Sequence, residues 1–237
     1  MLRYTRLWLP LILGTTGLSA VGSRTPTPVV VRFVSREVTL TAEVSDSLSP
    51  APSLLKRAQN RPEERVTFAV NGGFFDPSTG KSVGAIIVNS RVSTRGISTE
   101  GVFVYQLDGA VEVADHLPAG AQFAIGGNVL LVWNGRVDVR AGLRRNVSPE
   151  TRLERMCVGV NEDGSALIVC VFGTLKEVAE YMRVAGAARA AMIDCGSSCF
   201  VYRDGKVRVQ SRAPIKALIV GLHPVRINSI RNVRAGH

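Results

Sequence analysis

Residues 155–198, RMCVGVNEDGSALIVCVFGTLKEVAEYMRVAGAARAAMIDCGSS, contain the pattern that decides the fold. Two apolar runs flank Asp163-Gly164, and such a pair between apolar runs is the strongest short-range signal of a β-hairpin. After the second run, Thr174 and Glu177 form a capping box, which marks the start of a helix. A third apolar run follows at residues 189–193. The stretch therefore predicts strand, turn, strand, helix and strand.

The same turn signal recurs three times along the chain. Asp108-Gly109, Asn134-Gly135 and Asp204-Gly205 each separate two apolar, alternating runs. Both central residues of a type I′ turn need positive φ, which Asn, Asp and Gly adopt most readily. Four hairpins predict a mixed α/β fold of the α+β type, with antiparallel-rich mixed sheets flanked by a few helices.

Composition sets the class of protein. The chain has 237 residues, 46% of them hydrophobic, which excludes intrinsic disorder. A chain of this size buries about 70–75% of its unfolded surface, and its four cysteines are too few for a disulfide scaffold. We expect one domain over residues 23–237.

Residues 1–22 have the order of a secretory signal peptide. Arg3 and Arg6 precede the apolar run 7–13, and small residues follow it. The alternative is an uncleaved N-terminal membrane anchor, although the run is too short to span a bilayer comfortably. We therefore expect an exported protein, located in the periplasm, in the cell envelope or outside the cell.

The cysteines permit a geometric prediction. If Asp163-Gly164 is a two-residue turn, Cys157 lies directly opposite Cys170 within disulfide range. Two buried free thiols are the alternative. Cys195 and Cys199 could form a bond only if the loop between them is tight. No Cys-x-x-Cys or His-x-x-x-His spacing supports zinc, so the sequence predicts no metal and no cofactor.

Groups suited to binding phosphate occur in three segments. The backbone N–H groups of Gly72-Gly73 and Gly196 could form an anion-binding nest. Ser197-Ser198 would add hydroxyl donors, and Arg155 would add a planar guanidinium that matches phosphate. These residues predict a site where three strand ends converge.

A carboxylate and an amide complete this predicted site. Asp194 follows a strand and could act as a general acid or base, or stabilise a sugar cation. Asn71 could orient substrate hydroxyls. Asp76 is the nearest candidate for a second carboxylate.

The chain resembles the phosphodiester glycosidase domain family over residues 66–209. Five segments carry the resemblance in the family's order: AVNGGFFDPSTGKSVGAIIVNSRV (69–92), FAIGGNVLLVWNGRV (123–137), the Arg-containing strand 155–160, Thr174-Leu175, and Met192-Ile193-Asp194-Cys195-Gly196-Ser197-Ser198. The family's animal member removes an N-acetylglucosamine cap that is joined through phosphate to mannose.

The resemblance implies hydrolysis of the glycosidic bond of a sugar-1-phosphodiester. It implies the following site residues: Asn71, Gly72, Gly73, Arg155, Asp194, Gly196, Ser197 and Ser198. The chain departs from the family where the family has Asn before the Asp and three glycines after it. Here Met192-Ile193 precede Asp194, and Cys195-Gly196 follow it. A non-catalytic member of the family is therefore an alternative.

Positive charge is concentrated near the C-terminus. The net charge is +10, and it is +8 without Arg3 and Arg6. Residues 203–237 have a net charge of +7. Their basic residues are Arg203, Lys206, Arg208, Arg212, Lys216, Arg226, Arg231 and Arg234. A solvated face is one interpretation, and an anionic envelope glycopolymer as partner is the other.

Three functions remain open from the sequence. The first is an exported hydrolase acting on a sugar-1-phosphodiester. The second is a non-catalytic binding module for anionic envelope polysaccharide, and the third is a structural envelope protein. Export and the lack of interleaved aromatic residues argue against nucleic acid as a partner. A membrane would be contacted only through an uncleaved signal segment.

Overall fold

The computed structural model describes residues 26–62, 64–98, 101–140 and 147–224. The predicted signal peptide and the last three arginines of the basic segment lie outside these residues. Among the helices described, none is long and apolar enough to cross a membrane.

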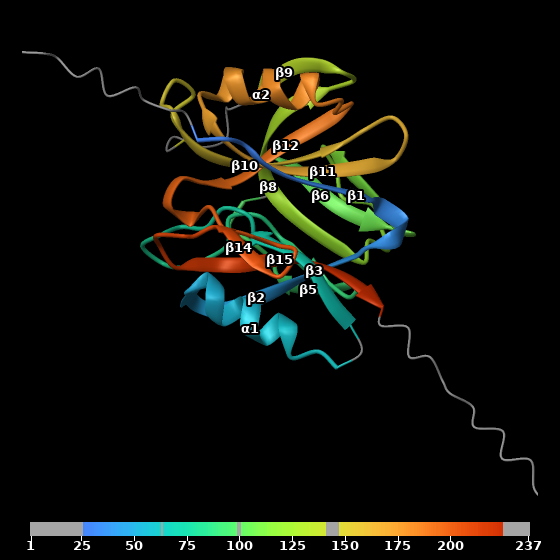
Figure 1. Ribbon diagram of the computed structural model, residues 1–237, viewed down its shortest axis with the longest axis vertical. Helices are drawn as coiled ribbons and strands as arrows, with labels where there is room; N and C mark the ends of the chain where they lie inside the picture. Colours follow the sequence, from blue (N-terminus) through green and yellow to red (C-terminus); the bar gives the residue numbers. More distant parts are fainter. Residues whose placement is uncertain (1–25, 63, 99–100, 141–146, 225–237) are drawn as a thin grey trace, which may run out of the picture.

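The fold consists of two antiparallel sheets, each covered on its outer face by one α-helix (Figure 1). All strand pairings described are antiparallel, as the four hairpin signals predicted. The ten-stranded sheet contains β1 (Val29–Val34), β4 (Ile86–Val88), β5 (Arg91–Thr94), β6 (Val102–Leu107), β7 (Ala110–Ala114), β8 (Phe123–Trp133), β9 (Arg136–Arg140), β10 (Leu153–Val160), β11 (Ser165–Gly173) and β12 (Arg189–Cys195). The five-stranded sheet contains β2 (Thr39–Ser49), β3 (Glu64–Asn71), β13 (Val201–Arg203), β14 (Lys206–Val209) and β15 (Ile215–Pro224).

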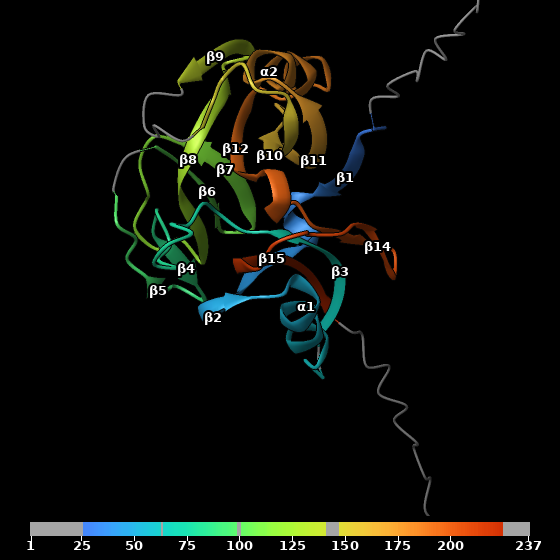
Figure 2. The same cartoon turned by 90° about the vertical axis from the view of Figure 1, so that its left-hand side faces the viewer.

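Apolar side chains form three clusters, one between the two sheets and one between each sheet and its helix. Figure 2 shows the sheets and helices that enclose them. The largest cluster lies between the two sheets and includes Phe68, Phe123 and Ile168. A second cluster packs the ten-stranded sheet against α2 (Leu175–Val184), and a third packs the five-stranded sheet against α1 (Ala51–Gln59). Successive side chains of a strand point to opposite sides of its sheet, so the same strand contributes apolar side chains to the cluster between the sheets and to the cluster under the helix.

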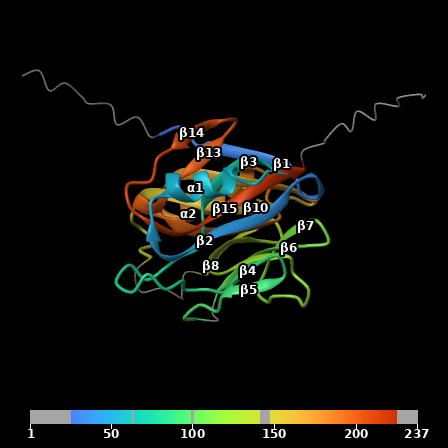
Figure 3. The same cartoon turned by 90° about the horizontal axis from the view of Figure 1, so that it is seen from below.

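Strand β8 changes partners along its length. Residues 123–128 pair with β4 and β6, whereas residues 129–133 pair with β12 and β9. Gly127, with φ +72, lies near this change of partners, in a conformation that glycine adopts without steric cost. Seen from below, β4, β5, β6 and β7 accordingly extend the sheet to one side, away from α1 (Figure 3).

The local predictions for the helix and for three turns are confirmed. Thr174 and Glu177 form the complete capping box at the start of α2. Positive φ occurs at both central residues of the turns 108–109, 134–135 and 204–205. These short-range signals are reliable because the required contacts lie within a few residues.

The fourth turn differs from the prediction. Only Gly164 has positive φ there, and the N–H of Asn161 donates to the Ser165 carbonyl at 2.9 Å across a three-residue loop. The extra loop residue shifts the register by one, so that Cys157 pairs with Val169 and Cys170 with Met156. A shift of one residue places two side chains on opposite faces of the sheet. The prediction that Cys157 lies opposite Cys170 is therefore wrong, which excludes the disulfide between them. The alternative of two buried free thiols agrees with this structure, in which all four cysteines are free.

Candidate functional site

Strand ends from both sheets meet at the candidate site. β3 ends at Asn71, whose backbone N–H donates to the Phe200 carbonyl at 3.3 Å. The Phe200 N–H donates in return to the Asn71 Oδ1 at 3.0 Å. One residue further, the Gly72 carbonyl accepts a hydrogen bond of 3.3 Å from the Asp194 N–H at the end of β12. These contacts hold the Asn-Gly-Gly segment against the Asp-Cys-Gly-Ser-Ser segment.

A pocket of about 330 Å³ opens at this junction. It is lined by Leu48, Phe75, Pro77, Asp194, Ser197, Ser198, Ala213 and Pro214. Three residues that the sequence predicted for the site, Asp194, Ser197 and Ser198, thus share one cavity. The others line it from apolar or proline-containing segments of β2, the loop after β3 and the segment before β15.

Asp194 is the single carboxylate among the residues that line this pocket. It is 8% exposed, and its Oδ1 accepts a 2.8 Å hydrogen bond from the Cys195 N–H. This bond fixes the carboxylate close to its own backbone. The short helix η2 (Gly196–Ser198) follows directly, and the Ser197 carbonyl accepts hydrogen bonds from the N–H groups of Arg212 and Ala213. The pocket therefore combines one held carboxylate with two serine hydroxyls.

Arg155 lies beside this segment but within the protein. It is near the start of β10, and because β10 and β12 are antiparallel, it pairs with Cys195 at the end of β12. Its side chain is fully buried, and the guanidinium donates to the carbonyls of Gly173 (2.9 Å), Ser148 (3.0 Å) and Thr151 (2.7 Å). In this structure the guanidinium thus binds backbone oxygens, and phosphate binding by Arg155 stays a prediction.

Arg155 forms no ion pair with a carboxylate among the contacts described, which are to backbone carbonyls and the sulfur of Met192. Burial lowers the pKa of its guanidinium from the usual value, because desolvation disfavours the charged form. The neighbouring thiols of Cys195, Cys157 and Cys199 act in the opposite direction on this pKa. The guanidinium therefore places a positive charge behind the end of β12.

Asn71 is also fully buried. Its Oδ1 is used by Phe200, whereas no hydrogen-bond partner is found for its Nδ2 within the part of the chain that the structure describes. A buried donor of this kind costs free energy unless a ligand or water satisfies it. The observed contacts make Asn71 a positioning residue for the two motif segments.

The glycines of the predicted nest allow close packing of backbone. A Cβ on Gly72 would lie 2.9 Å from both the Cβ and the carbonyl oxygen of Ala217, and a Cβ on Gly73 would lie 2.6 Å from a methyl group of Ile125. Gly196 has φ +68 and open space around it. Gly72 and Gly73 are therefore required for close packing against β15 and β8, and Gly196 for its backbone conformation.

Asp76 belongs to a turn next to the pocket. Its Oδ1 accepts hydrogen bonds from the Ser78 N–H at 2.8 Å, the Ser78 hydroxyl at 2.6 Å and the Thr79 N–H at 3.2 Å. The hydrogen bonds from Ser78 hold the pKa of the Asp76 carboxyl below its usual value. Phe75 and Pro77 on either side of it line the pocket. Asp76 itself is not among the residues that line the pocket, and its role as second carboxylate stays a prediction.

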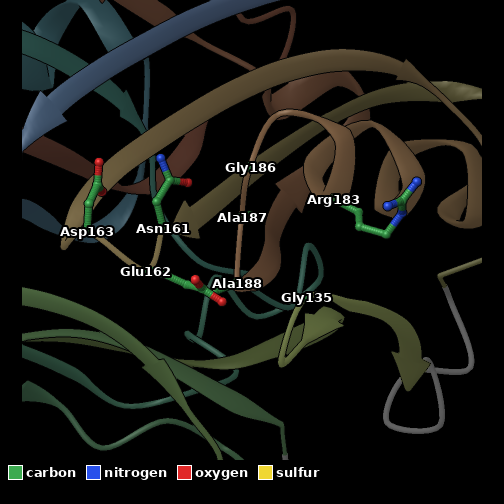
Figure 4. A pocket seen from close by; sticks show the side chains of 8 residues that line it. All are labelled: Gly135, Asn161, Glu162, Asp163, Arg183, Gly186, Ala187 and Ala188. Atoms are coloured by element: carbon green, nitrogen blue, oxygen red, sulfur yellow. The ribbon is translucent and has the colours of Figure 1, made fainter.

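A second pocket, of about 370 Å³, lies at the β10–β11 hairpin (Figure 4). It is lined by Gly135, Asn161, Glu162, Asp163, Arg183, Gly186, Ala187 and Ala188. The Arg183 guanidinium extends away from the hairpin residues and forms an ion pair with Glu180. This pocket contains none of the residues predicted for the site, and its acidic residues come from an exposed turn.

Sequence reasoning missed the apolar walls of the candidate site. Phe75 and Pro77 lie inside the recognised segment 69–92, so their positions carried a signal. Leu48 and Pro214 carried none, because they approach the pocket only through the pairing of β2 with β15.

Among the described residues, no group of three or more His, Cys, Asp or Glu side chains is arranged to hold a metal ion.

The fold is shared with solved structures at low sequence identity. A hypothetical protein from Synechocystis aligns with TM-score 0.70 and 14% identity, over 83% of this chain and 59% of that one. The catalytic domain of zebrafish N-acetylglucosamine-1-phosphodiester alpha-N-acetylglucosaminidase, auto-inhibited by its pro-peptide, aligns with TM-score 0.65 and 15% identity, over 84% of each chain. A Burkholderia pseudomallei protein described as exported aligns with TM-score 0.56 and 13% identity, over 82% of this chain and 73% of that one.

The sequence profile of the phosphodiester glycosidase family matches residues 64–220. This match covers the site segments and most of both sheets, so the chain belongs to the phosphodiester glycosidase family. The resemblance inferred from the five segments is thereby confirmed. A search of curated protein sequences finds no match.

Proposed function

We propose that the protein hydrolyses the glycosidic bond of a sugar-1-phosphodiester in the pocket formed by Asp194, Ser197 and Ser198. The observation that carries this proposal is the position of Asp194. It lies at a strand end, nearly buried, beside two hydroxyl donors in a cavity large enough for a small ligand. Membership of the phosphodiester glycosidase family supports cleavage of the bond between a sugar and a phosphate. The pocket offers two serine hydroxyls for the phosphate and the Asp194 carboxyl for the glycosidic bond.

In the proposed reaction, the hydroxyls of Ser197 and Ser198 and the N–H of Gly196 donate hydrogen bonds to phosphate oxygens. The positive charge of Arg155 behind β12 favours the anion electrostatically. Asp194, when protonated, gives its proton to the phosphate oxygen as the bond from that oxygen to the anomeric carbon breaks. Water then adds to the sugar cation and gives one proton to the Asp194 carboxylate, which restores the acid. The products are free sugar and a phosphate monoester.

Turnover of defined diesters tests this proposal. The purified chain is offered a panel of methyl diesters of glucose-, mannose- and N-acetylglucosamine-1-phosphate, and free sugar is measured. Asp194→Asn should lower the rate at least about 100-fold, because general acid catalysis contributes typically 10²–10⁴-fold. It should preserve the fold, since an amide oxygen can still accept from the Cys195 N–H. Asp163→Asn, in the exposed hairpin turn, is the matched control and should leave the rate unchanged.

One observation favours a second function. Glycosidases generally use a pair of carboxylates, and Asp194 is the single carboxylate among the residues lining the pocket. A non-catalytic module that binds anionic glycopolymer would need only the donors. If no diester is turned over but a teichoic-acid-type polymer binds in a salt-sensitive way, the binding module replaces the hydrolase. If neither occurs, a structural envelope role remains.

We further propose export and an envelope glycopolymer as the natural partner. Local ion pairs reduce the charge that the described part of the basic segment can offer such a partner. Arg203 and Arg208 both approach Asp204, and Arg212 pairs with Glu154 at 2.8 Å, so part of the positive charge is balanced locally. Fractionation of cells that express the full chain tests export, because a signal peptide would be removed from the exported protein.

A further inference from the structure

Two cysteines from different parts of the fold meet in the layer between the sheets. Cys170 lies on β11 and is 6% exposed, and Cys199 follows η2 and is 1% exposed. Both side chains belong to the apolar cluster between the sheets. Alternation along β11 directs Cys170 into this layer, while its neighbours Val169 and Val171 pack towards α2.

The two thiols lie against the same strand. Cys170 pairs with Met156 of β10, and η2, which Cys199 directly follows, packs against β10. In agreement with this placement, an interaction with Cys170 is the first cause that raises the pKa of Cys199 well above its usual value, and burial adds to it. Around them lie apolar side chains of β10, β12 and β13, including Met156, Ile193 and Val201.

The other two cysteines lie on the opposite face of the ten-stranded sheet. Cys157 belongs to the cluster under α2, and Cys195 packs against the same cluster. The pairs Cys157–Cys170 and Cys195–Cys199 would each have to cross the sheet. Since a disulfide requires Cβ atoms about 3.5–4.5 Å apart, neither pair suits the fold.

We propose that Cys170 and Cys199 form a disulfide bond when the protein folds in the presence of a disulfide oxidant. Each thiol loses its proton, and one S–S bond replaces the two S–H bonds. The two electrons and two protons pass to the disulfide of the oxidant, such as oxidised glutathione, which becomes two thiols. This inference does not depend on the proposed reaction.

The bond would fix one wall of the pocket. Cys199 directly follows Ser197-Ser198, and the next residue, Phe200, is held by Asn71. A covalent link to β11 would anchor this segment to the ten-stranded sheet, while Phe200 anchors it to β3 of the other sheet. The bond thus spans the two sheets at the site.

Peptide mapping tests the pairing. Trypsin releases peptide 156–176, which contains Cys157 and Cys170, and peptide 190–203, which contains Cys195 and Cys199. The full chain is refolded in a glutathione redox buffer, alkylated under denaturing conditions and digested. The two peptides should be joined, with a mass about 2 Da below their sum. A disulfide within either peptide, or four alkylated thiols in the folded protein, would overturn the proposal.

Variants assign the link to its residues. The double variant Cys157→Ala/Cys195→Ala should keep the joined peptides, whereas Cys170→Ala and Cys199→Ala should each lose them. In the double variant, oxidation should raise the melting temperature by about 5–10 °C, because a disulfide restricts the unfolded chain. Two results would contradict the Cys170–Cys199 disulfide: joined peptides in Cys199→Ala, or a melting temperature of the double variant that does not depend on redox state.

Discussion

The Oδ1 of Asn71 accepts a 3.0 Å hydrogen bond from the N–H of Phe200, and the N–H of Asn71 donates to the Phe200 carbonyl at 3.3 Å. This two-way contact joins the end of β3 to the segment that follows η2. Because Asp194 binds the Gly72 carbonyl one residue further, the same contact also sets the distance between the two halves of the site.

Replacement of this amide should weaken both the fold and the site. In Asn71→Ala, the buried N–H of Phe200 loses its side-chain acceptor, which costs about 1–3 kcal/mol in the free energy of unfolding. Turnover or ligand binding should fall as well. Urea denaturation measures the first effect, and Asn60→Ala, at the exposed end of α1, should change the free energy of unfolding by less than about 0.5 kcal/mol.

Arg155 should resist conservative replacement. In Arg155→Lys, one ammonium group replaces a planar fork that serves three carbonyls, so at least one buried oxygen loses its donor. We expect a loss of about 3 kcal/mol in the free energy of unfolding. Arg140→Lys, at an exposed ion pair with Asp138, is the control and should cost at most about 1 kcal/mol. Equal stability of Arg155→Lys and the wild type would contradict the structural role.

A side chain at Gly72 should displace the motif. The Cβ of Gly72→Ala would lie 2.9 Å from the Ala217 carbonyl oxygen, which belongs to the backbone of β15 and cannot rotate away. Overpacking of this kind costs about 1–3 kcal/mol, and it should also reduce turnover by separating Gly72 from Asp194. Gly135→Ala, in an exposed turn with open space, should lower stability by about 1–2 kcal/mol without changing turnover.

The capping box should make stability depend on pH. The hydrogen bond from the Thr174 N–H and the nearby Arg152 hold the pKa of Glu177 below its usual value in the folded protein. Its stabilising contribution is therefore present above the unfolded pKa, about 4.3, and is lost as pH falls through the folded pKa. The melting temperature of Glu177→Gln should lie below that of the wild type at pH 7, and the two should converge near pH 3.

The partner residue of the capping box provides a pH-independent comparison. Thr174→Ala removes the hydroxyl that accepts from the Glu177 N–H, and the loss of such a cap costs about 1 kcal/mol. A difference between Glu177→Gln and the wild type that stays constant from pH 7 to pH 3 would contradict the proposed contribution of the carboxylate.

The sequence by itself determined the features that depend on near neighbours. Three of the four Asx-Gly turns and the Thr174–Glu177 capping box are correct, because they need only local φ values and contacts within four residues. The order of the motif segments also identified the family. The sequence further predicted that Asp194, Ser197 and Ser198 belong together, since they follow one strand end.

Tertiary structure alone decided the register of β10 against β11, the faces of the cysteines and the walls of the pocket. One extra residue in the turn at Asp163-Gly164 moved Cys170 away from Cys157 and into the layer that holds Cys199. The burial of Arg155 and the approach of Leu48 and Pro214 depend on strands that are distant in sequence. Such contacts follow from the packing of two sheets, which no local pattern of residues encodes.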